Sequence, residues 1–279
     1  MGRRRNLQGS RMLITGASQG IGKALAEEAV RRGLQVVAVA RSADLLEELA
    51  QSGRRQEGRL EIVVADITDP DGRQRMVKGT IEHFGGLDIL VNNAGIGATG
   101  HFVEVSPERL RRIMEVNFFG LTETTRALLP LLRQGRQPAI VNISSVAGKR
   151  GIPARSEYSA SKFAVQGFSE ALRAELAKDG IDVLVVCPGL TRTNFSRNML
   201  EQKARLPLDH LRGMTPEKVS AATLRALEQG RREIHLTFDG KLIVFLNRFF
   251  PRLADRIAAR RVRALFREEI ARRQLEQQK

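Results

Sequence analysis

The sequence predicts an α/β fold, with one doubly wound parallel sheet of about seven strands and helices on both faces. Three observations support this prediction. Short β-branched runs alternate with longer segments rich in helix formers, from residue 12 to residue 237. The runs are apolar almost without interruption, which is typical of strands covered on both faces. A glycine-rich loop follows the first run and opens the first helical segment, the strand–turn–helix order typical of this fold class.

The elements follow in a regular order. Strands are expected at Met12–Thr15, Gln35–Ala40, Leu60–Ala65, Ile89–Val91, Ala139–Ile143, Val183–Cys187 and Glu233–Thr237. Helices are expected between them at Gly22–Arg32, Leu45–Gln51, Gly72–Phe84, Pro107–Leu132, Tyr158–Lys178 and Pro216–Gly230. The polar, proline-containing segment Arg192–Thr215 lies between a strand and a helix and is predicted to be a lid over a site. The alternative is a surface excursion without function.

Composition and charge define the organisation of the chain. Of its 279 residues, 42% are hydrophobic and 28% are charged, which excludes disordered, collagen-like and coiled-coil proteins. The formal net charge of +15 lies mostly at the ends, since residues 1–11 carry +4, residues 241–279 carry +7, and the body between them only +4. We therefore expect a basic N-terminal tail over residues 1–10, one α/β domain over 11–240 and a basic amphipathic extension over 241–279.

Cysteine and histidine usage argues against disulfides and metal sites. The one cysteine, Cys187, excludes an internal disulfide, and the four histidines are scattered without the spacing of metal ligands. The N-terminal arginine cluster is not followed by an apolar run, and no window reaches the roughly 18 apolar residues of a membrane span. We expect no metal and a reducing, cytoplasmic location.

The segment Thr15–Gly22 reads Thr-Gly-Ala-Ser-Gln-Gly-Ile-Gly and joins a predicted strand to a predicted helix. Its glycines allow a tight turn and a close approach of the backbone to a pyrophosphate. The helix N-terminus offers free N–H groups and the positive end of its dipole to that anion. Because the strand and the helix are both present, the loop predicts a Rossmann-type dinucleotide site rather than an ordinary turn.

The end of the second strand indicates which dinucleotide is bound. A carboxylate there hydrogen-bonds the ribose 2′-hydroxyl of NAD, whereas a basic side chain accommodates the 2′-phosphate of NADP. The sequence has Arg41 and Ser42 at this point. Since an arginine pairs with a phosphate through two N–H groups, NADP(H) is favoured over NAD(H). The alternative is that Arg41 is a solvated residue at the start of the next helix.

The single tyrosine, Tyr158, precedes Lys162 by four residues, so the two side chains share one face of a helix. A free tyrosine has a pKa of about 10 and is a poor base at neutral pH. A neighbouring ammonium and an oxidised nicotinamide both favour the phenolate, which can exchange a proton with a substrate hydroxyl or carbonyl oxygen. Ser145 follows a strand upstream of this pair and can hydrogen-bond the same oxygen.

Taken together, these motifs resemble the short-chain dehydrogenase/reductase family over most of residues 10–240. The matching motifs are the TGxxxGIG loop, Asp66 after the third strand, Asn92-Asn93-Ala94-Gly95 after the fourth, Asn117 within a helix, Ser145, the YxxxK pair Tyr158 and Lys162, and Pro188-Gly189 with Thr193. The segment from Ala147 to Ala164 is similar to the members that act on lipid-like carbonyls, the reductases and hydroxysteroid dehydrogenases.

The resemblance implies a role for each matching residue. Tyr158 is the expected general acid/base, and Lys162 is expected to lower its pKa and hold the nicotinamide ribose. Ser145 is expected to polarise the substrate oxygen, and Asn117 to complete a water-linked proton relay. The expected cofactor contacts are Gly16, Ser18, Gln19, Gly20, Ile21, Gly22, Arg41, Ser42, Asp66, Ile67, Asn92, Asn93, Ala94, Gly95, Tyr158, Lys162, Pro188, Gly189, Thr191 and Thr193.

Each assignment has a structural alternative when it is taken alone. Asn117 could be a buried helix asparagine, and Asn92 could brace the sheet. Ser144 and Ser145 could cap the strand before them, and Asp66 could cap the helix that follows it.

As a set, the motifs predict an NADP(H)-dependent oxidoreductase that interconverts a ketone and a secondary alcohol and reduces a hydrophobic or lipid-like carbonyl. Cofactor and substrate sites then share the domain 11–240. The alternative is a catalytically idle nucleotide-binding protein that recruits a partner or a membrane surface through its basic tail. The segments expected to shape the substrate pocket are Gly97–Phe102, Lys149–Glu157 and Arg192–Thr215, and no anion clamp is evident in them.

Two further features bear on partners. The helices Pro107–Leu132 and Tyr158–Lys178 match the pair through which the family forms oligomers, so a homodimer or homotetramer is expected. A helix is expected over Arg252–Arg273, with an apolar stripe beside a row of arginines. Peripheral association with the inner membrane surface and packing on the protein itself or on a second subunit are both open for this extension. The lack of aromatic residues among the arginines argues against nucleic acid.

Overall fold

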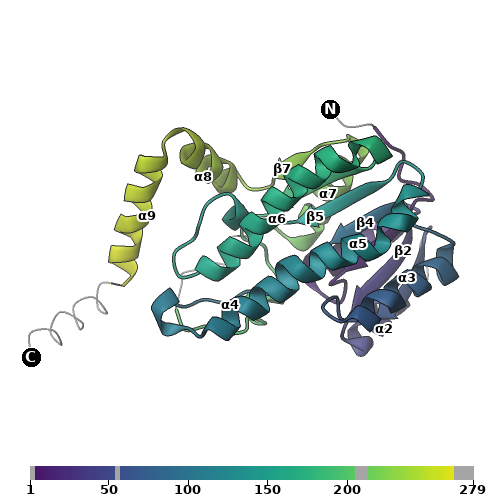
Figure 1. The fold of residues 1–279 in the computed structure, drawn as a ribbon, viewed down its shortest axis with the longest axis horizontal. Helices are drawn as coiled ribbons and strands as arrows, with labels where there is room; N and C mark the ends of the chain where they lie inside the picture. Colours follow the sequence, from purple (N-terminus) through teal and green to yellow (C-terminus); the bar gives the residue numbers. More distant parts are fainter. Residues whose placement is uncertain (1–3, 54–56, 205–212, 267–279) are drawn as a thin grey trace, which may run out of the picture.

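The computed structural model describes residues 4–53, 57–204 and 213–266, and it has the predicted α/β architecture (Figure 1). Within these residues the sheet is parallel throughout, and its strands lie in the order β3-β2-β1-β4-β5-β6-β7. The strands are β1 (Arg11–Thr15), β2 (Gln35–Ala40), β3 (Arg59–Val64), β4 (Ile89–Asn92), β5 (Ala139–Ile143), β6 (Asp182–Cys187) and β7 (Glu233–His235). The order reverses between β1 and β4, and in such sheets ligands bind at the carboxyl ends of the strands beside that point.

Helices cover both faces of the sheet. One apolar core joins the sheet to α1 (Gly20–Arg31), α2 (Ala43–Gly53) and α7 (Pro216–Glu228). A second core, on the other face, joins it to α3 (Pro70–Phe84), α5 (Gly120–Arg133) and α6 (Ser156–Glu175). The five central strands are almost completely buried, and their sequences are accordingly almost continuously apolar. The predicted strands match the observed ones within two residues at each end.

One predicted helix is interrupted. The segment expected to be a single helix over Pro107–Leu132 consists of α4 (Pro107–Met114), a π-helical turn (Glu115–Phe119) and α5. The turn contains Asn117, whose side chain is bonded to groups outside its own helix, as described below. Such turns are rare and recur at functional sites.

The C-terminal extension holds two helices within the described residues, α8 (Phe238–Phe249) and α9 (Pro251–Leu265). The strand predicted to reach Thr237 ends earlier, because the hydroxyl of Thr237 accepts the Gly240 N–H at 3.0 Å and starts α8. Pro251, which has no N–H to donate, separates α8 from α9. The last residues of the helix predicted over Arg252–Arg273 lie outside the described residues.

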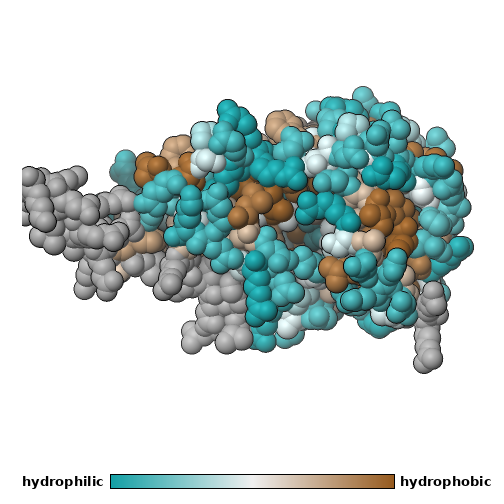
Figure 2. Space-filling model, turned by 90° about the horizontal axis from the view of Figure 1, so that it is seen from below, coloured by the Kyte–Doolittle hydropathy of each residue, from teal (hydrophilic) through white to brown (hydrophobic). Residues whose placement is uncertain are grey.

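The extension exposes many large apolar side chains. They are Phe238, Leu242, Ile243, Phe245, Phe249, Phe250, Leu253 and Ile257. Figure 2 shows hydrophobic residues at the α8–α9 end and in separate patches elsewhere on an otherwise hydrophilic face. None of the helices that the structure describes is long and apolar enough to cross a membrane.

The predicted basic N-terminal tail is partly packed onto the domain. Arg5 is buried, and its guanidinium lies 2.5 Å from the carboxylate of Asp182 and donates to the carbonyl oxygen of Leu227 at 3.0 Å. Leu7 is also buried. Within the described residues, part of the positive charge at this end therefore belongs to the folded body.

Candidate active site

A cavity of about 1260 Å³ lies at the carboxyl ends of the strands, where the strand order reverses. Its walls come from the loops after β1, β2, β3, β4, β5 and β6, from the start of α6, and from α8 and α9. The residues predicted to bind a cofactor that line it are Gly16, Ser18, Gln19, Gly20, Ile21, Arg41, Ser42, Asp66, Ile67, Asn93, Ala94, Gly95, Tyr158, Lys162, Pro188, Gly189, Thr191 and Thr193, and Ser145 lines it as well.

The glycine loop is packed so closely against neighbouring backbone that two of its glycines leave no room for a side chain. Gly16 has φ +66°, and a Cβ atom there would lie 2.8 Å from the Cα of Ala94. A Cβ on Gly22 would lie 2.2 Å from the carbonyl oxygen of Gly16. The side-chain amide of Asn93 donates to that same oxygen at 3.0 Å and holds the loop after β4 against the glycine loop. The cradle fits the pyrophosphate of a dinucleotide, which needs close approach to backbone N–H groups.

Arg41 and Asp66 meet at the edge of the cavity. Their side chains approach to 3.8 Å, and Arg41 is 64% exposed. Burial acts to raise the pKa of Asp66, but two hydrogen bonds from Thr68 and the charge of Arg41 outweigh it and lower that pKa. Asp66 does not cap α3; that role belongs to Asp69, whose carboxylate accepts from the first N–H groups of the helix. Asp66 is thus left ionised and facing the cavity.

Tyr158 lies in the first turns of α6 with 8% of its surface exposed, and Ser145 lines the same cavity. Burial raises the pKa of Tyr158, and the charge of Arg155 and the nearby hydroxyl of Ser145 only partly oppose this. The expected effect of Lys162 on this pKa stays a prediction, and the large effect of burial was not foreseen. The physical reason is that helical spacing shows which side chains are neighbours but not how far each is buried.

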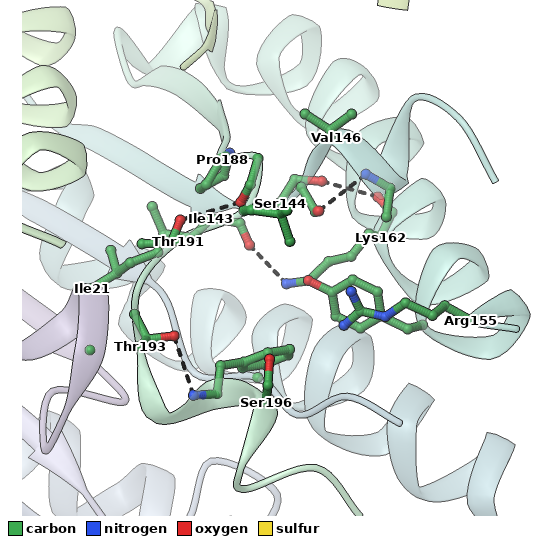
Figure 3. A pocket seen from close by; sticks show the side chains of 18 of the residues that line it. Ile21, Ile143, Ser144, Val146, Arg155, Lys162, Pro188, Thr191, Thr193 and Ser196 are labelled. Atoms are coloured by element: carbon green, nitrogen blue, oxygen red, sulfur yellow. Dashed lines mark hydrogen bonds between the residues drawn. The ribbon is translucent and has the colours of Figure 1, made fainter. Parts of the chain in front are cut away.

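Lys162 is held by the sheet rather than by Tyr158. Its ammonium donates to the carbonyl oxygen of Ile143 at 2.9 Å and lies 5.9 Å from the centre of the Tyr158 ring (Figure 3). Burial lowers the pKa of Lys162 to about 8, so the side chain is mostly protonated at neutral pH. The ammonium has two further N–H groups to offer to a ligand in the cavity.

Asn117 is fully buried and does not line the cavity. Its side-chain oxygen accepts the Ile96 N–H at 2.8 Å, and its amide donates to the carbonyl oxygen of Ile96 and to the Ser161 hydroxyl, each at 2.9 Å. These bonds tie the loop after β4 to the helix that carries Tyr158. Asn117 is thus a buried helix asparagine, as the structural alternative expected. Its predicted function in a proton relay stays a prediction.

Two predicted cofactor contacts also do not line the cavity. Asn92 is buried within the sheet, where its amide donates to Thr125 at 3.0 Å and to Asn142 at 2.9 Å. The side chain of Asn92 points toward α5 and β5, so the residue braces the sheet, which was the structural alternative. Gly22 packs against the backbone of Gly16 and so supports the glycine loop without lining the cavity itself.

The described part of the predicted lid lies across the cavity. Main-chain bonds join Leu200 to Gly97 at 2.9 Å and Lys203 to Thr99 at 3.0 Å. The Asn198 amide also donates to the Gln19 side chain at 3.1 Å, so this segment touches the glycine loop. Residues 205–212 of the predicted lid lie outside the described residues.

The sequence motifs gave no reason to select Arg155 or Phe195. The Arg155 guanidinium lies 4.7 Å from the centre of the Tyr158 ring, and the Phe195 ring lies 5.7 Å from it. In Figure 3, Arg155 reaches into the cavity from the side opposite Ile21. The signal available in the sequence was the three-residue step from Arg155 to Tyr158, which places both on one side of a helix start.

The structure also brings together Cys187, Glu233 and His235, whose potential ligand atoms lie within 4.8 Å of one another. The ammonium of Lys149 already lies 2.8 Å from the Glu233 carboxylate. Burial raises the pKa of Cys187 to about 12, so the thiol keeps its proton, whereas metal ligation needs the thiolate. The group is explained as an ionic contact that holds β7, and we assign no metal to it.

Comparisons with known proteins agree with the fold and the motifs. The family model for short chain dehydrogenases matches residues 10–204. A bovine protein named dehydrogenase/reductase SDR family member 7B is 35% identical over 263 residues, covering 90% of this chain and 81% of its own.

Two solved structures share the fold. A short chain dehydrogenase/reductase from Burkholderia phymatum, in complex with NAD, superposes with a TM-score of 0.82 at 25% identity and covers 89% of this chain and 96% of its own. An alcohol dehydrogenase from Thermococcus sibiricus, complexed with 5-hydroxy-NADP, has a TM-score of 0.73 at 26% identity and covers 82% of this chain and 96% of its own.

Proposed function

Because the chain belongs to the short-chain dehydrogenase family, we propose that it is an NADP(H)-dependent oxidoreductase that interconverts a ketone and a secondary alcohol. One observation carries the proposal: Tyr158, Ser145 and Lys162 meet on the wall of a cavity that also contains a glycine cradle. That arrangement brings a proton donor, a hydrogen-bonding hydroxyl and a cation to the place where a nicotinamide and a carbonyl would meet.

The reaction divides between cofactor and protein. A bound NADPH supplies the hydride that reduces the carbonyl carbon. Tyr158 gives its proton to the carbonyl oxygen, while the Ser145 hydroxyl hydrogen-bonds that oxygen and orients it. Because burial raises the pKa of Tyr158, the residue keeps its proton at neutral pH, which suits a donor working in the direction of reduction. Lys162 offers its remaining N–H groups to the ribose hydroxyls.

The preference for NADP(H) is argued from Arg41 and Ser42, which line the cavity directly after β2. The two solved relatives described above carry NAD and an NADP derivative, so likeness to them favours neither cofactor. Arg41 lies mostly in solvent with only a 3.8 Å approach to Asp66, so its guanidinium is available to a 2′-phosphate.

Replacing Arg41 with aspartate should reverse the cofactor preference. The substitution removes the cation that pairs with the 2′-phosphate and adds a carboxylate that repels it and can accept from a 2′-hydroxyl. We expect the ratio of Kd for NADH to Kd for NADPH to fall by about 100-fold, measured by the fluorescence of the bound reduced cofactor. The matched control is Arg126→Asp, at an exposed arginine on α5. A wild-type protein that binds NADH more tightly than NADPH would overturn the assignment.

The substrate is proposed to be hydrophobic. Ile243 and Leu246 on α8, Ile257 and Val262 on α9, and Phe266 directly after α9 line the cavity with apolar groups. The experiment is an NADPH-oxidation screen across ketosteroids, long-chain ketolipids and small polar carbonyls. The proposal requires turnover that rises with the apolar surface of the ketone, and it fails if only small polar carbonyls are reduced.

Assembly and location follow from exposed apolar surface. We propose a homodimer or homotetramer through α4, α5 and α6, where Phe119 and Phe163 are about half exposed. We also propose that α8 and α9 lie on an anionic membrane surface, because apolar side chains and the exposed arginines Arg252, Arg256 and Arg260 share these helices.

A further inference from the structure

Arg155 is a half-buried cation without an anionic partner among the described residues. Its Nε is shielded from solvent and has no hydrogen-bond partner there, and its side chain makes neither an ion pair nor a hydrogen bond with those residues. The contact that the guanidinium does make is with the face of the Tyr158 ring. A contact of the guanidinium with a ring face leaves its N–H groups available to a hydrogen-bond acceptor.

The nearby charges do not satisfy Arg155. The carboxylate closest in sequence, Glu157, is buried and bonded to Arg109 at 2.7 Å. Burial lowers the pKa of Arg155, and Tyr158 is the one group identified as opposing this. A shielded N–H group without a hydrogen-bond partner, like the Nε of Arg155 among the described residues, lowers the stability of a protein, and such groups persist where a ligand completes them.

Arg155 faces the substrate side of the cavity. A Cβ atom placed on Gly97 would lie 3.4 Å from a terminal nitrogen of Arg155 and 2.9 Å from the ring of Phe195. Both side chains therefore lie directly beside Gly97. Gly97, Arg155 and Phe195 come from three separate segments, each predicted to shape the substrate pocket. Ile21, which belongs to the glycine loop, lies on the opposite side of the cavity from Arg155 (Figure 3). The guanidinium is therefore directed at the substrate rather than at the dinucleotide.

We propose that Arg155 binds an oxyanion of the substrate, a carboxylate or a phosphate, carried close to the carbonyl that Tyr158 protonates. This inference rests on the proposed carbonyl chemistry and narrows its substrate class. Because the guanidinium lies over the Tyr158 ring, the anion sits within a few bonds of the reacting carbonyl. The apolar residues of α8 and α9 line the same cavity, so the substrate is an amphiphile whose charged end meets Arg155.

The turnover arm of the test uses matched pairs of charged and neutral ketones. Acetoacetate is compared with methyl acetoacetate, and hydroxyacetone phosphate with hydroxyacetone, which separates carboxylates from phosphates. We expect wild type to prefer the charged member of at least one pair by about 10- to 100-fold in kcat/KM, mainly through KM. Arg155→Gln should abolish that preference, Arg155→Lys should retain part of it, and Arg111→Gln, an exposed arginine on α4, should retain all of it.

The binding arm does not depend on turnover. Decanoate and decyl phosphate, with decanol as the neutral control, are titrated into the NADP-loaded protein by calorimetry. We expect at least one anion to bind wild type about tenfold or more tightly than Arg155→Gln. Anion binding that depends on Arg155, in a protein that reduces no ketone, would support the anion site and reject the carbonyl chemistry. Ketone reduction without any charge preference, with equal anion binding by wild type and Arg155→Gln, would overturn the anion site alone.

Discussion

At the scale of single residues, the site is defined by burial as much as by residue type. Tyr158, Ser145 and Lys162 lie where their spacing in the sequence predicts, because helical spacing and strand ends determine which side chains meet. Their protonation could not be predicted in the same way. Lys162 is bonded to the Ile143 carbonyl, and the packing of the sheet around Tyr158 raises its pKa.

Arg155 shows the limit of motif analysis at this scale. The segment Lys149–Glu157 suggested no anion clamp, since one arginine in a mixed segment is ordinary. Only the fold shows that its Nε is shielded, that its side chain is unpaired among the described residues, and that its guanidinium lies over the Tyr158 ring. The sequence cannot show that an arginine lacks hydrogen-bond partners in the fold, so Arg155 could not be selected from a motif.

Lys162→Met should stabilise the cofactor-free protein while abolishing its activity. The folded-state pKa of Lys162 is lowered to about 8 from 10.5, so burying the charged form disfavours folding below pH 8. That penalty disappears as the pH rises from 8 to 10.5. We expect the variant to gain about 1 to 3 kcal/mol in the free energy of unfolding at pH 7, partly offset by the lost bond to Ile143, and the gain to shrink toward pH 10.

Urea unfolding at a series of pH values measures this difference. Ser161 sits beside Lys162 with its hydroxyl already bonded, so Ser161→Ala is a control that should show no such pH dependence. A stability difference between Lys162→Met and wild type that is constant from pH 7 to pH 10 would contradict the assignment of a buried, charged Lys162.

At the scale of elements, α4 and α6 are joined by a buried ion pair at the base of the site. Arg109 on α4 donates to the Glu157 carboxylate at 3.1 and 2.7 Å, and both side chains are almost fully buried. Arg109 also approaches Glu201, at 3.3 Å, in the segment that crosses the cavity. Since Glu157 directly precedes Tyr158, the pair sets the position of the first turn of α6.

Glu157→Gln should lower the free energy of unfolding by about 2 to 4 kcal/mol, because it leaves the Arg109 charge buried with a weaker partner. The double change Arg109→Met with Glu157→Leu should recover much of the loss, since it removes both charges. Denaturant unfolding measures both variants, with Glu175→Gln as the control at an exposed glutamate on the same helix. Equal stability of Glu157→Gln and wild type would show that the pair does not support α6.

Element boundaries were predictable where a backbone rule decides them. Strands buried on both faces and helices that begin at Pro107, Pro216 or Pro251 follow from composition and from proline at the first helical position. The π-helical turn at Glu115–Phe119 was not predictable, because it depends on bonds from Asn117 to Ile96 and Ser161, partners far from it in sequence.

At the scale of the whole molecule, the charge at the two ends has two different uses. Arg5 is paired with Asp182 within the folded body. In the extension, Arg150 on the body contacts Asn247 and Asp255 and docks α8 and α9 beside the cavity, while the outer face keeps exposed phenylalanines and arginines. The same helices thus line the cavity and expose apolar and basic side chains on their outer face.

Reversing charge on the outer face should weaken binding to anionic membranes. Arg252→Glu with Arg256→Glu changes two exposed residues of α9, and each basic residue near an anionic surface contributes about 1 kcal/mol. We expect partition onto phosphatidylserine vesicles, measured by sedimentation, to fall at least tenfold, with no pelleting on neutral vesicles in either case. A control with Arg126→Glu should pellet like wild type. If the double variant pellets with phosphatidylserine vesicles as much as wild type does, the extension is not a membrane contact.

The most direct test of the account is Tyr158→Phe, because the proposed chemistry depends on one hydroxyl proton. The change leaves the ring that packs with Arg155 and Phe195. We measure NADPH oxidation with the best ketone of the screen, and NADPH binding by fluorescence. The account predicts that kcat falls by about 100-fold or more while the Kd for NADPH changes less than about twofold. A variant that turns over the ketone at the wild-type rate would contradict it.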